Sequence, residues 1–309
     1  MRFSIWPSVT QPWDDIYEIT VHCEQTGWDG VYIADHFMPN SPEPGDGDML
    51  ECWSVISALA ALVPRVRLAS LVTSVTYRHP AVLANIAAAV DQVSHGRLTL
   101  GIGAGWQLNE HAAYGIPLGS LRERMDRFEE ATQMLNSLLR QRRTTFSGQY
   151  FALTDAPNQP APVQDPLPLL IGGSGERRML RVVARYADEW NAWTTPEVLA
   201  HKMSVLREHC EQVGRDPAEI HVSTQGMLYL STDAGWVRDK KRAASEADPG
   251  RPVIAGTPAE VTDIVGRYRE AGADELIFSD ATLGSGARKK ETCDLLMTEV
   301  APAFRPASA

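Results

Sequence analysis

The sequence predicts an α/β protein whose eight parallel strands close into a (β/α)8 barrel, the TIM-barrel architecture. Short apolar runs alternate eight times with segments of helical periodicity, and this alternation indicates a parallel sheet because parallel strands need crossover connections. The length of 309 residues suits one such barrel. A doubly wound open sheet is the alternative, but no glycine fingerprint follows the first apolar run.

The first half of the chain supplies four strand–helix pairs. Strands are expected at 2–7, 30–35, 66–73 and 97–105. Helices are expected near 13–26 and 51–63, from Pro80, and from Ser120. Proline suits the first helical position because its missing N–H would have no partner there. Ser120 with Glu123 forms a capping box, which marks the start of the fourth helix.

The second half repeats the pattern with two interruptions. Strands are expected at 168–173, 188–193, 219–226 and 274–280. Helices are expected at 176–187, from Pro196, from Pro258, and over 288–302. Insertions are expected near 144–166, with a small hairpin, and near 226–256, where 231–252 is polar and forms an excursion. We expect residues 1–309 to form a single domain.

Composition and charge narrow the classes of function. Lys and Arg number 29 against 39 Asp and Glu, so the net charge is −10, opposite in sign to a non-specific nucleic-acid binder. No apolar run approaches a membrane span of roughly 20 residues, and the N-terminus lacks a secretory signal. The four cysteines form no CxxC pair, which favours reduced thiols and a cytoplasmic protein. A small molecule is therefore the expected partner.

The barrel prediction directs attention to polar residues that follow strands, since the site of such a barrel lies at the C-terminal ends of its strands. His36 follows Asp35 there and is a candidate proton donor or acceptor; a capping aspartate and a packing histidine are the alternative. Glu110 is a second candidate, whereas we interpret His111 as structural. No HxH, HExxH or GxSxG spacing indicates a metal site or a hydrolase nucleophile.

A glycine-rich run follows the fifth predicted strand. It comprises Gly172, Gly173, Ser174 and Gly175. Glycines let backbone N–H groups approach an anion, and a helix start presents further unpaired donors. Arg177 and Arg178 would oppose the helix dipole in the next turn, and a bound phosphate would offset that conflict. A tight turn with solvated arginines is the alternative.

A second glycine-rich run, GIGAG at 101–105, is followed by Trp106. The glycines indicate either close approach to a planar ring or steric room inside the barrel. Trp106 is expected to stack on a ligand, the alternative being that it fills the barrel mouth. With Trp6, Trp190 and Trp193 it predicts an aromatic rim around a large flat ligand.

Several segments together carry a resemblance to a known family. They are, in order, GWDGVYIADHF (27–37), TYRHPAVLA (76–84), DQVSHGRLTLGIGAGW (91–106), NEHAAYG (109–115), GGSGERRML (172–180), ADEWN (187–191) and GTPAEV (256–261). Over nearly its whole length the chain resembles the bacterial luciferase-like flavin and deazaflavin enzymes, and within them the members that use coenzyme F420.

The resemblance implies roles for individual residues. Asp35 and His36 match a strand-two pair beside the cofactor ring, with the histidine as the proposed acid/base. Ser70-Leu71 matches a bulge that often holds a non-proline cis peptide behind the ring. Thr73 would contact the ring edge and Asn109 the pyrimidine side. The glycine run 172–175 would hold the phosphate, with Arg177 beside it, and Trp106 would stack at the ring. A homodimer is also implied.

The implied activity is hydride transfer between F420 and a small organic substrate, with the loops 37–52 and 226–256 shaping the pocket. The anionic oligoglutamate tail of F420 would need additional basic side chains to bind it. The candidates are Arg78, His79, Arg177 and Arg178. Members that oxidise glucose 6-phosphate carry a tryptophan and a glutamate where this chain has Asn40 and Trp106, so the resemblance does not extend to that substrate. Alternatives are an FMN-dependent monooxygenase, a non-catalytic flavin-binding protein, and a metal-dependent barrel hydrolase.

Overall fold

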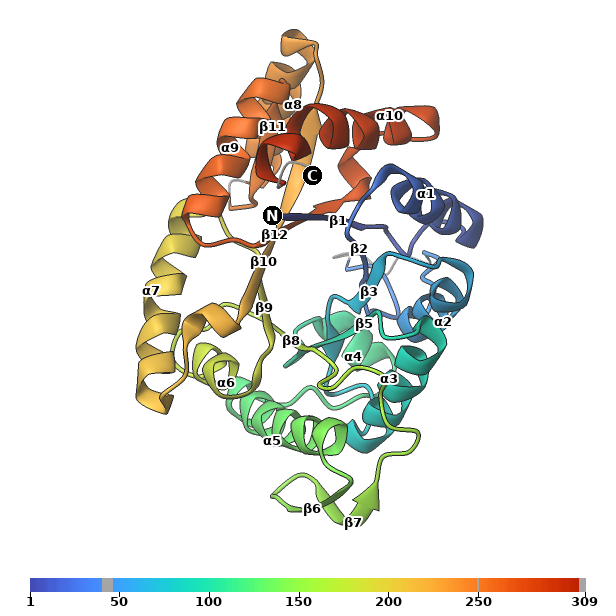
Figure 1. Cartoon of the computed structure of the whole chain (residues 1–309), viewed down its shortest axis with the longest axis vertical. Helices are drawn as coiled ribbons and strands as arrows, with labels where there is room; N and C mark the ends of the chain where they lie inside the picture. Colours follow the sequence, from blue (N-terminus) through green and yellow to red (C-terminus); the bar gives the residue numbers. More distant parts are fainter. Residues whose placement is uncertain (41–46, 249, 306–309) are drawn as a thin grey trace.

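The structure is a computed structural model that describes residues 1–40, 47–248 and 250–305. Among these residues eight parallel strands close into a barrel, so the predicted (β/α)8 architecture is confirmed (Figure 1). The barrel strands, in order around the ring, are β1 (Arg2–Trp6), β2 (Gly30–Ile33), β3 (Arg67–Ser70), β5 (Leu98–Gly103), β8 (Leu169–Gly172), β9 (Glu189–Ala192), β10 (His221–Leu230) and β12 (Glu275–Ser279). Pairing of β9 with β10 and of β12 with β1 leaves no open edge among these described strands.

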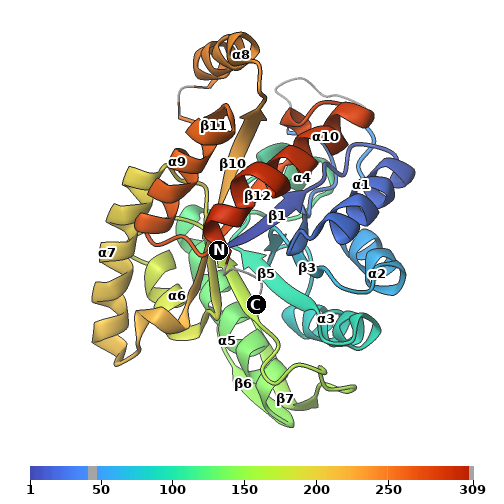
Figure 2. The same ribbon diagram turned by 45° about the horizontal axis from the view of Figure 1, so that its top comes forward.

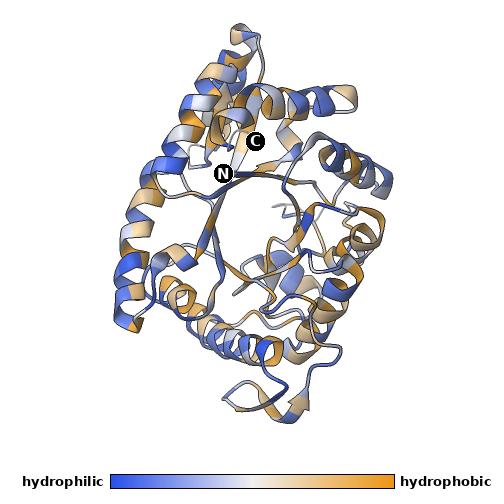
Figure 3. Cartoon of the chain, viewed as in Figure 1, coloured by the Kyte–Doolittle hydropathy of each residue, from blue (hydrophilic) through white to orange (hydrophobic). Residues whose placement is uncertain are grey.

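Helices surround the barrel and cover its outer face (Figure 1). They are α1 (Trp13–Thr26), α2 (Cys52–Leu62), α3 (Pro80–Ser94), α4 (Leu108–Ala113), α5 (Leu121–Arg140), α6 (Met179–Tyr186), α7 (Pro196–Val213), α8 (Ala234–Ala247), α9 (Pro258–Glu270) and α10 (Ala287–Leu295). Figure 3 shows both hydrophobic and hydrophilic residues around these helices, as expected for helices that bury one face. Within the described residues, no helix is both long and apolar enough to cross a membrane.

The predicted helix starts are borne out by their hydrogen bonds. Ser120 and Glu123 form the expected capping box of α5, and Thr257 with Glu260 forms one at α9. After α10 the chain continues through a π-helical turn (Leu296–Val300) and a 3-10 turn (Ala301–Phe304). The terminal ammonium of Met1 donates to the Phe304 carbonyl at 3.0 Å, which ties this last segment to the start of β1.

The structure matches the prediction for the first insertion but not for the second. The first holds the expected hairpin, in which β6 (Arg143–Ser147) pairs antiparallel with β7 (Ala152–Pro157) and projects from the barrel beside α5 (Figure 2). The second, expected to be an irregular excursion, contains α8 and the strand β11 (Val253–Gly256), which pairs with the far end of β10. Asp233 caps α8 by accepting from two backbone N–H groups, a start signal that the polar composition obscured.

The expected strand 66–73 is broken in the structure. Strand β3 ends at Ser70, and β4 (Thr73–Ser74) resumes beside β5 after a cis peptide bond between Leu71 and Val72. The cis bond expected at Ser70-Leu71 is therefore wrong by one residue. The Leu71 N–H still donates to the Ile33 carbonyl at 2.8 Å, so the ladder with β2 extends through that peptide and breaks only after it. Part of the predicted loop 37–52, residues 41–46, lies outside the described residues.

Candidate active site

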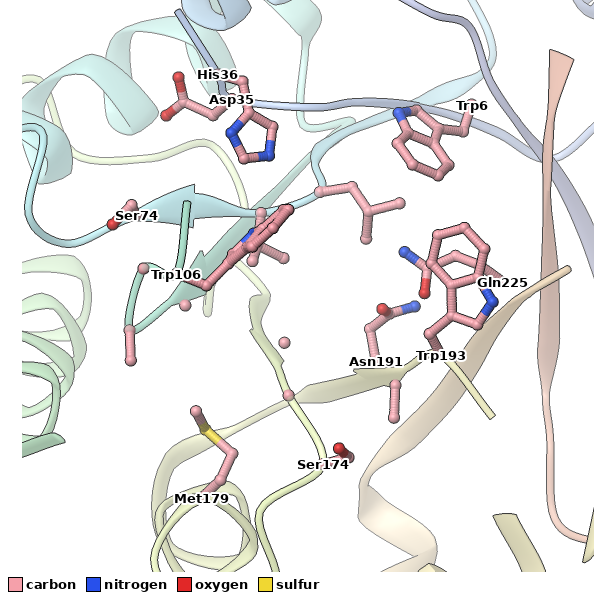
Figure 4. A pocket seen from close by; sticks show the side chains of 18 of the residues that line it. Trp6, Asp35, His36, Ser74, Trp106, Ser174, Met179, Asn191, Trp193 and Gln225 are labelled. Carbon is pink, nitrogen blue, oxygen red and sulfur yellow. The ribbon is translucent and has the colours of Figure 1, made fainter. Parts of the chain in front are cut away.

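A pocket of about 450 Å³ opens at the C-terminal ends of the barrel strands (Figure 4). Seven of the predicted site residues line it: Asp35, His36, Leu71, Trp106, Gly172, Gly173 and Ser174. The other five do not: Ser70, Thr73, Asn109, Gly175 and Arg177. The pocket walls also include side chains to which the sequence assigned no role, among them Tyr77, Asn191 and Gln225.

His36 is held by a buried carboxylate. Its Nδ1 lies 2.7 Å from Oε1 of Glu110, a fully buried residue of α4, and since a carboxylate only accepts, Nδ1 carries the proton. Tyr77 Oη donates to the same oxygen, and the Phe37 N–H donates to Oε2 at 2.8 Å. Burial opposes ionisation of Glu110, but the hydrogen bonds from His36, Tyr77 and Phe37 outweigh it, so the pKa of Glu110 is lowered. The imidazole is therefore held through Nδ1, and its Nε2 atom is the nitrogen left to interact with a ligand.

Asp35 is also buried and paired. Arg78 Nη1 donates to its Oδ2 at 2.5 Å and Nη2 to its Oδ1 at 3.2 Å, while Nη2 also contacts Glu51. Burial raises the pKa of Asp35, and the charge and hydrogen bonds of Arg78 offset this only in part. Arg78 is thus committed to two carboxylates. His79 is exposed and accepts from the Ala81 N–H through Nδ1 at the start of α3, so of these two residues His79 keeps a nitrogen for an anionic tail.

Ser70 and Thr73 lie behind the pocket wall. Ser70 Oγ donates to the Gly101 carbonyl at 2.8 Å and accepts from the Gly101 N–H at 3.0 Å. Thr73 Oγ1 accepts from Trp53 Nε1 at 3.0 Å. Both side chains are fully buried, so they support the bulge whose Leu71 and Val72 line the pocket.

The glycines of the GIGAG run make room for that bulge. A Cβ on Gly101 would lie 1.9 Å from the Ser70 carbonyl oxygen, and one on Gly103 would lie 2.8 Å from Val72 Cγ2. Gly172, across the pocket floor, would meet Val72 at 2.9 Å. Of the two interpretations given above, steric room inside the barrel is the one that the geometry favours.

The glycine turn after β8 presents backbone donors. Gly173 has φ +137°, a conformation reserved for glycine, and its own N–H donates to the Asn191 carbonyl at 2.9 Å. Within the described part of the chain, the N–H groups of Ser174 and Gly175 have no hydrogen-bond partner. Ser174 is exposed at the pocket edge. The turn can therefore receive an oxyanion.

The two arginines after this turn differ. Helix α6 begins at Met179, later than expected, after a turn at 176–178 in which Glu176 pairs with Lys202 Nζ at 2.6 Å. Arg178 binds Asp126 (2.7 Å) and Glu129 (3.2 Å) of α5. Arg177 is exposed and has no ion pair among the described residues. Only Arg177 remains available to an anion at the turn.

The aromatic rim is confirmed in part. Trp6 and Trp193 pack edge to face with ring centres 5.8 Å apart, and both line the pocket. Trp106 is 58% exposed and stands edge to face against His36 at 5.6 Å. Trp190 is fully buried instead, and its Nε1 donates to the Gly173 carbonyl at 2.8 Å, so it supports the glycine turn from behind.

Two residues of α4, Asn109 and His111, support the site without lining the pocket. Asn109 donates to the Pro39 carbonyl at 3.0 Å and accepts from the Glu110 N–H at 2.8 Å, which places Glu110 rather than contacting the pocket. His111 bonds Thr76 Oγ1 and the Gln107 carbonyl, each at 2.7 Å, in agreement with its structural interpretation. Among the described residues, no three His, Cys, Asp or Glu side chains gather where they could hold a metal ion.

Gln225 and Asn191 went unassigned at the sequence level. Gln225 lies near the middle of β10, where the barrel rim is reached, and Asn191 lies in β9. The predicted strand 219–226 ended beside Gln225, so the rule that selects polar residues at strand ends could have found it. Asn191 lies near the end of the predicted strand 188–193 and in the ADEWN segment, so the same rule could have selected it.

Comparison with known proteins agrees with this geometry. A family model described as luciferase-like monooxygenase matches residues 1–247. An F420-dependent glucose-6-phosphate dehydrogenase of Kineococcus radiotolerans is 29% identical over 320 residues, covering 94% of this chain and 92% of the relative.

Two solved structures share the fold. An F420-dependent secondary alcohol dehydrogenase in complex with an F420-acetone adduct superposes with a TM-score of 0.85 at 21% identity, covering 99% of each chain. The oxygenating constituent of a diketocamphane monooxygenase from Pseudomonas putida, in complex with FMN, gives 0.76 at 18% identity and also covers 99% of each chain. The family match over most of the sequence, together with this barrel, shows that the chain belongs to the luciferase-like monooxygenase family and is a luciferase-like oxidoreductase.

Proposed function

We propose that this oxidoreductase uses coenzyme F420 and transfers a hydride between the deazaflavin and a small organic substrate. The observation that carries the proposal is the His36–Glu110 pair, which opens onto a pocket whose opposite side is an anion-receiving glycine turn. The F420-dependent name of the relative aligned over nearly the whole chain supports the choice of cofactor.

The residues present fit such a cofactor. Gly173 has φ +137°, which L side chains rarely adopt, and a Cβ there would also crowd Met179 Cε at 3.0 Å, so the path of the turn favours glycine. We assign the phosphate to the N–H groups of Ser174 and Gly175 with Arg177 beside them, and the ring to the surface formed by Leu71 and Val72. When bound, the deazaflavin supplies a carbon that gives or accepts a hydride.

The chain itself supplies position and a proton. Because Glu110 holds Nδ1, the Nε2 atom of His36 is the one that exchanges a proton with the substrate oxygen. Tyr77 stays protonated, since burial and the neighbouring Glu110 raise its pKa well above the usual value. Trp106, Trp6 and Trp193 surround the pocket with apolar surface that excludes water from the reacting atoms.

The alternative that the fold shares is an FMN-dependent monooxygenase. One phosphate would satisfy the glycine turn equally well, and Arg78, one of the basic residues expected for the longer F420 tail, is already paired with Asp35 and Glu51. Titration of the protein with F420 and with FMN, followed by fluorescence, decides between them. Tight FMN binding without F420 binding would reverse the assignment.

The proton role of His36 has its own test. We expect His36→Ala to bind cofactor as the wild type does and to lose most of its turnover, by roughly 10²–10⁴-fold, the usual contribution of general acid–base catalysis. Full turnover by a variant that binds cofactor normally would show that His36 moves no proton. Full cofactor occupancy of the wild type without reaction across many acceptors would favour a non-catalytic binding protein.

A further inference from the structure

One wall of the pocket has so far been given no role beyond the exclusion of water. It is formed by Trp6 at the end of β1, Trp193 just after β9, and Gln225 in β10. Figure 4 shows these three side chains together on the side of the pocket away from His36. The wall thus combines two packed indole rings with the Gln225 amide, and the Asn191 amide lies next to it.

The Gln225 side chain reaches the pocket and makes no hydrogen bond to the rest of the described chain. The residue is 8% exposed. Its neighbour in the barrel, Asn191, is by contrast engaged, since Nδ2 donates to Ser223 Oγ at 2.9 Å. Gln225 lines the pocket, so its amide is accessible there and open to a hydrogen bond from a ligand. The indole nitrogens of Trp6 and Trp193 are buried without a hydrogen-bond partner, so among these three side chains the amide is the polar group that a ligand can reach.

The charge of this partner is restricted by what lines the pocket. Among the described residues, no Lys or Arg lines it, and its one carboxylate, Asp35, is paired with Arg78. Residues 41–46, 249 and 306–309 contain no Lys or Arg either. Arg251 lies 5.2 Å from the centre of the Trp193 ring but pairs with Asp248. An anionic group at this wall would lose its hydration with no counterion to replace it.

We propose, on the basis of the function proposed above, that Trp6, Trp193 and Gln225 form the substrate subsite and select an uncharged, ring-containing carbonyl compound or the matching alcohol. Its flat apolar body lies against the indoles. A second uncharged hydrogen-bonding group, opposite the reacting oxygen, pairs with the Gln225 amide. In the reducing direction the carbonyl carbon gains a hydride from the reduced deazaflavin, which is oxidised by two electrons. The C=O π bond breaks, and the oxygen gains the Nε2 proton of the His36 imidazolium, which returns to the neutral ring with its Nδ1–H still donated to Glu110.

Three related probes test the subsite, two of equal size and one that lacks the second group. 4-Acetylbenzamide carries a neutral second group, 4-acetylbenzoate a charged one, and acetophenone none. Their binding to the protein loaded with oxidised cofactor is measured by calorimetry. We expect the benzamide to bind roughly tenfold more tightly than either of the others, the effect of one hydrogen bond that a buried group needs. Binding of the benzoate as tight as that of the benzamide, or no binding of any probe, would overturn the proposal.

Variants at position 225 separate substrate from cofactor recognition. Gln225→Leu should abolish the advantage of the benzamide over acetophenone and leave the affinity for cofactor unchanged, whereas Gln212→Leu, an exposed glutamine of α7, should change neither. Gln225→Glu keeps the size of the side chain and should reject the benzoate further. A loss of cofactor affinity in Gln225→Leu, with normal folding by circular dichroism, would assign the amide to the cofactor and refute the subsite.

The cofactor titration is performed first, so the two proposals fail separately. If the protein binds FMN in place of F420, the same probes are applied to the FMN-loaded protein. The proposed function is then wrong while the substrate subsite is still tested. If F420 binds and the probes show no preference for the neutral second group, the subsite alone is wrong.

Discussion

The substitution Glu110→Gln tests the link between the buried carboxylate and His36. The introduced glutamine would have nearly the same shape as Glu110 but no charge, and its amide has one oxygen to accept and one NH2 group to donate. In the native structure three donors converge on the two carboxylate oxygens, from His36, Tyr77 and Phe37. An amide facing these three donors would direct its NH2 group at one of them, and two donors facing each other form no hydrogen bond.

The size of the effect follows from these contacts. A hydrogen bond to a charged group contributes about 1.5–3 kcal/mol, and the His36 Nδ1–Glu110 bond at 2.7 Å is of this kind. If that stabilisation holds His36 in the reactive orientation, its loss lowers turnover by roughly 10- to 150-fold. Tyr77→Phe removes one neutral donor and leaves the carboxylate, so it should cost only severalfold.

The assay separates positioning from binding. Turnover and cofactor affinity are measured for both variants with the substrate that gives the highest rate, across the pH range in which the protein stays folded. We expect Glu110→Gln to lower kcat while the cofactor Kd and the substrate KM change little, and to alter the pH profile of kcat. An unchanged kcat and pH profile, or a loss confined to thermal stability, would refute the view that Glu110 acts through His36.

Two further predictions concern charge elsewhere in the barrel. Arg177→Ala should weaken cofactor binding up to about fivefold, less at high salt, while Arg178→Ala should leave the cofactor Kd unchanged, since its guanidinium is bound to α5; titrations at two salt concentrations compare them. Burial opposes ionisation of Glu275, but His221 and Arg67 outweigh it and lower its pKa from 4.5 to about 2. Ionised Glu275 therefore adds about 3 kcal/mol to the free energy of unfolding above pH 4.5, and this stabilisation is lost as the pH falls to about 2. In denaturant melts, the difference in the free energy of unfolding between the wild type and Glu275→Gln should therefore shrink as the pH is lowered from 4.5 to about 2.

The barrel was predictable because its signals are local and repeated. Pro80, Ser120 and Thr257 mark helix starts by chemistry that acts within one turn, and the structure places helices there. Strand β11 was missed because it depends on a distant partner: it pairs with the far end of β10, and no local sequence signal shows that pairing. Helix α6 begins at Met179, after a turn at 176–178 that was expected to be helical.

Site residues were predictable where their position at the end of a strand was enough to place them in the pocket. Asp35, His36 and Gly173 follow strands directly and line the pocket. Arg78 was expected at the cofactor tail and Trp190 at the aromatic rim. The structure instead pairs Arg78 with Asp35 and bonds Trp190 to the Gly173 carbonyl, and no sequence spacing encodes these contacts. Residues that match the family at a position can therefore support the pocket without touching it, as Ser70 and Thr73 do.

The relation between His36 and Glu110 shows how such contacts change a functional interpretation. From the sequence the two were rival candidates for proton transfer. In the structure Glu110 is fully buried and its oxygens are occupied by three donors, so it has no free surface from which to reach a substrate. His36 lines the pocket and has one nitrogen uncommitted. The geometry therefore favours one proton-transferring residue with one positioning residue behind it, and predicts that removing either lowers kcat while only His36 contacts the reacting oxygen.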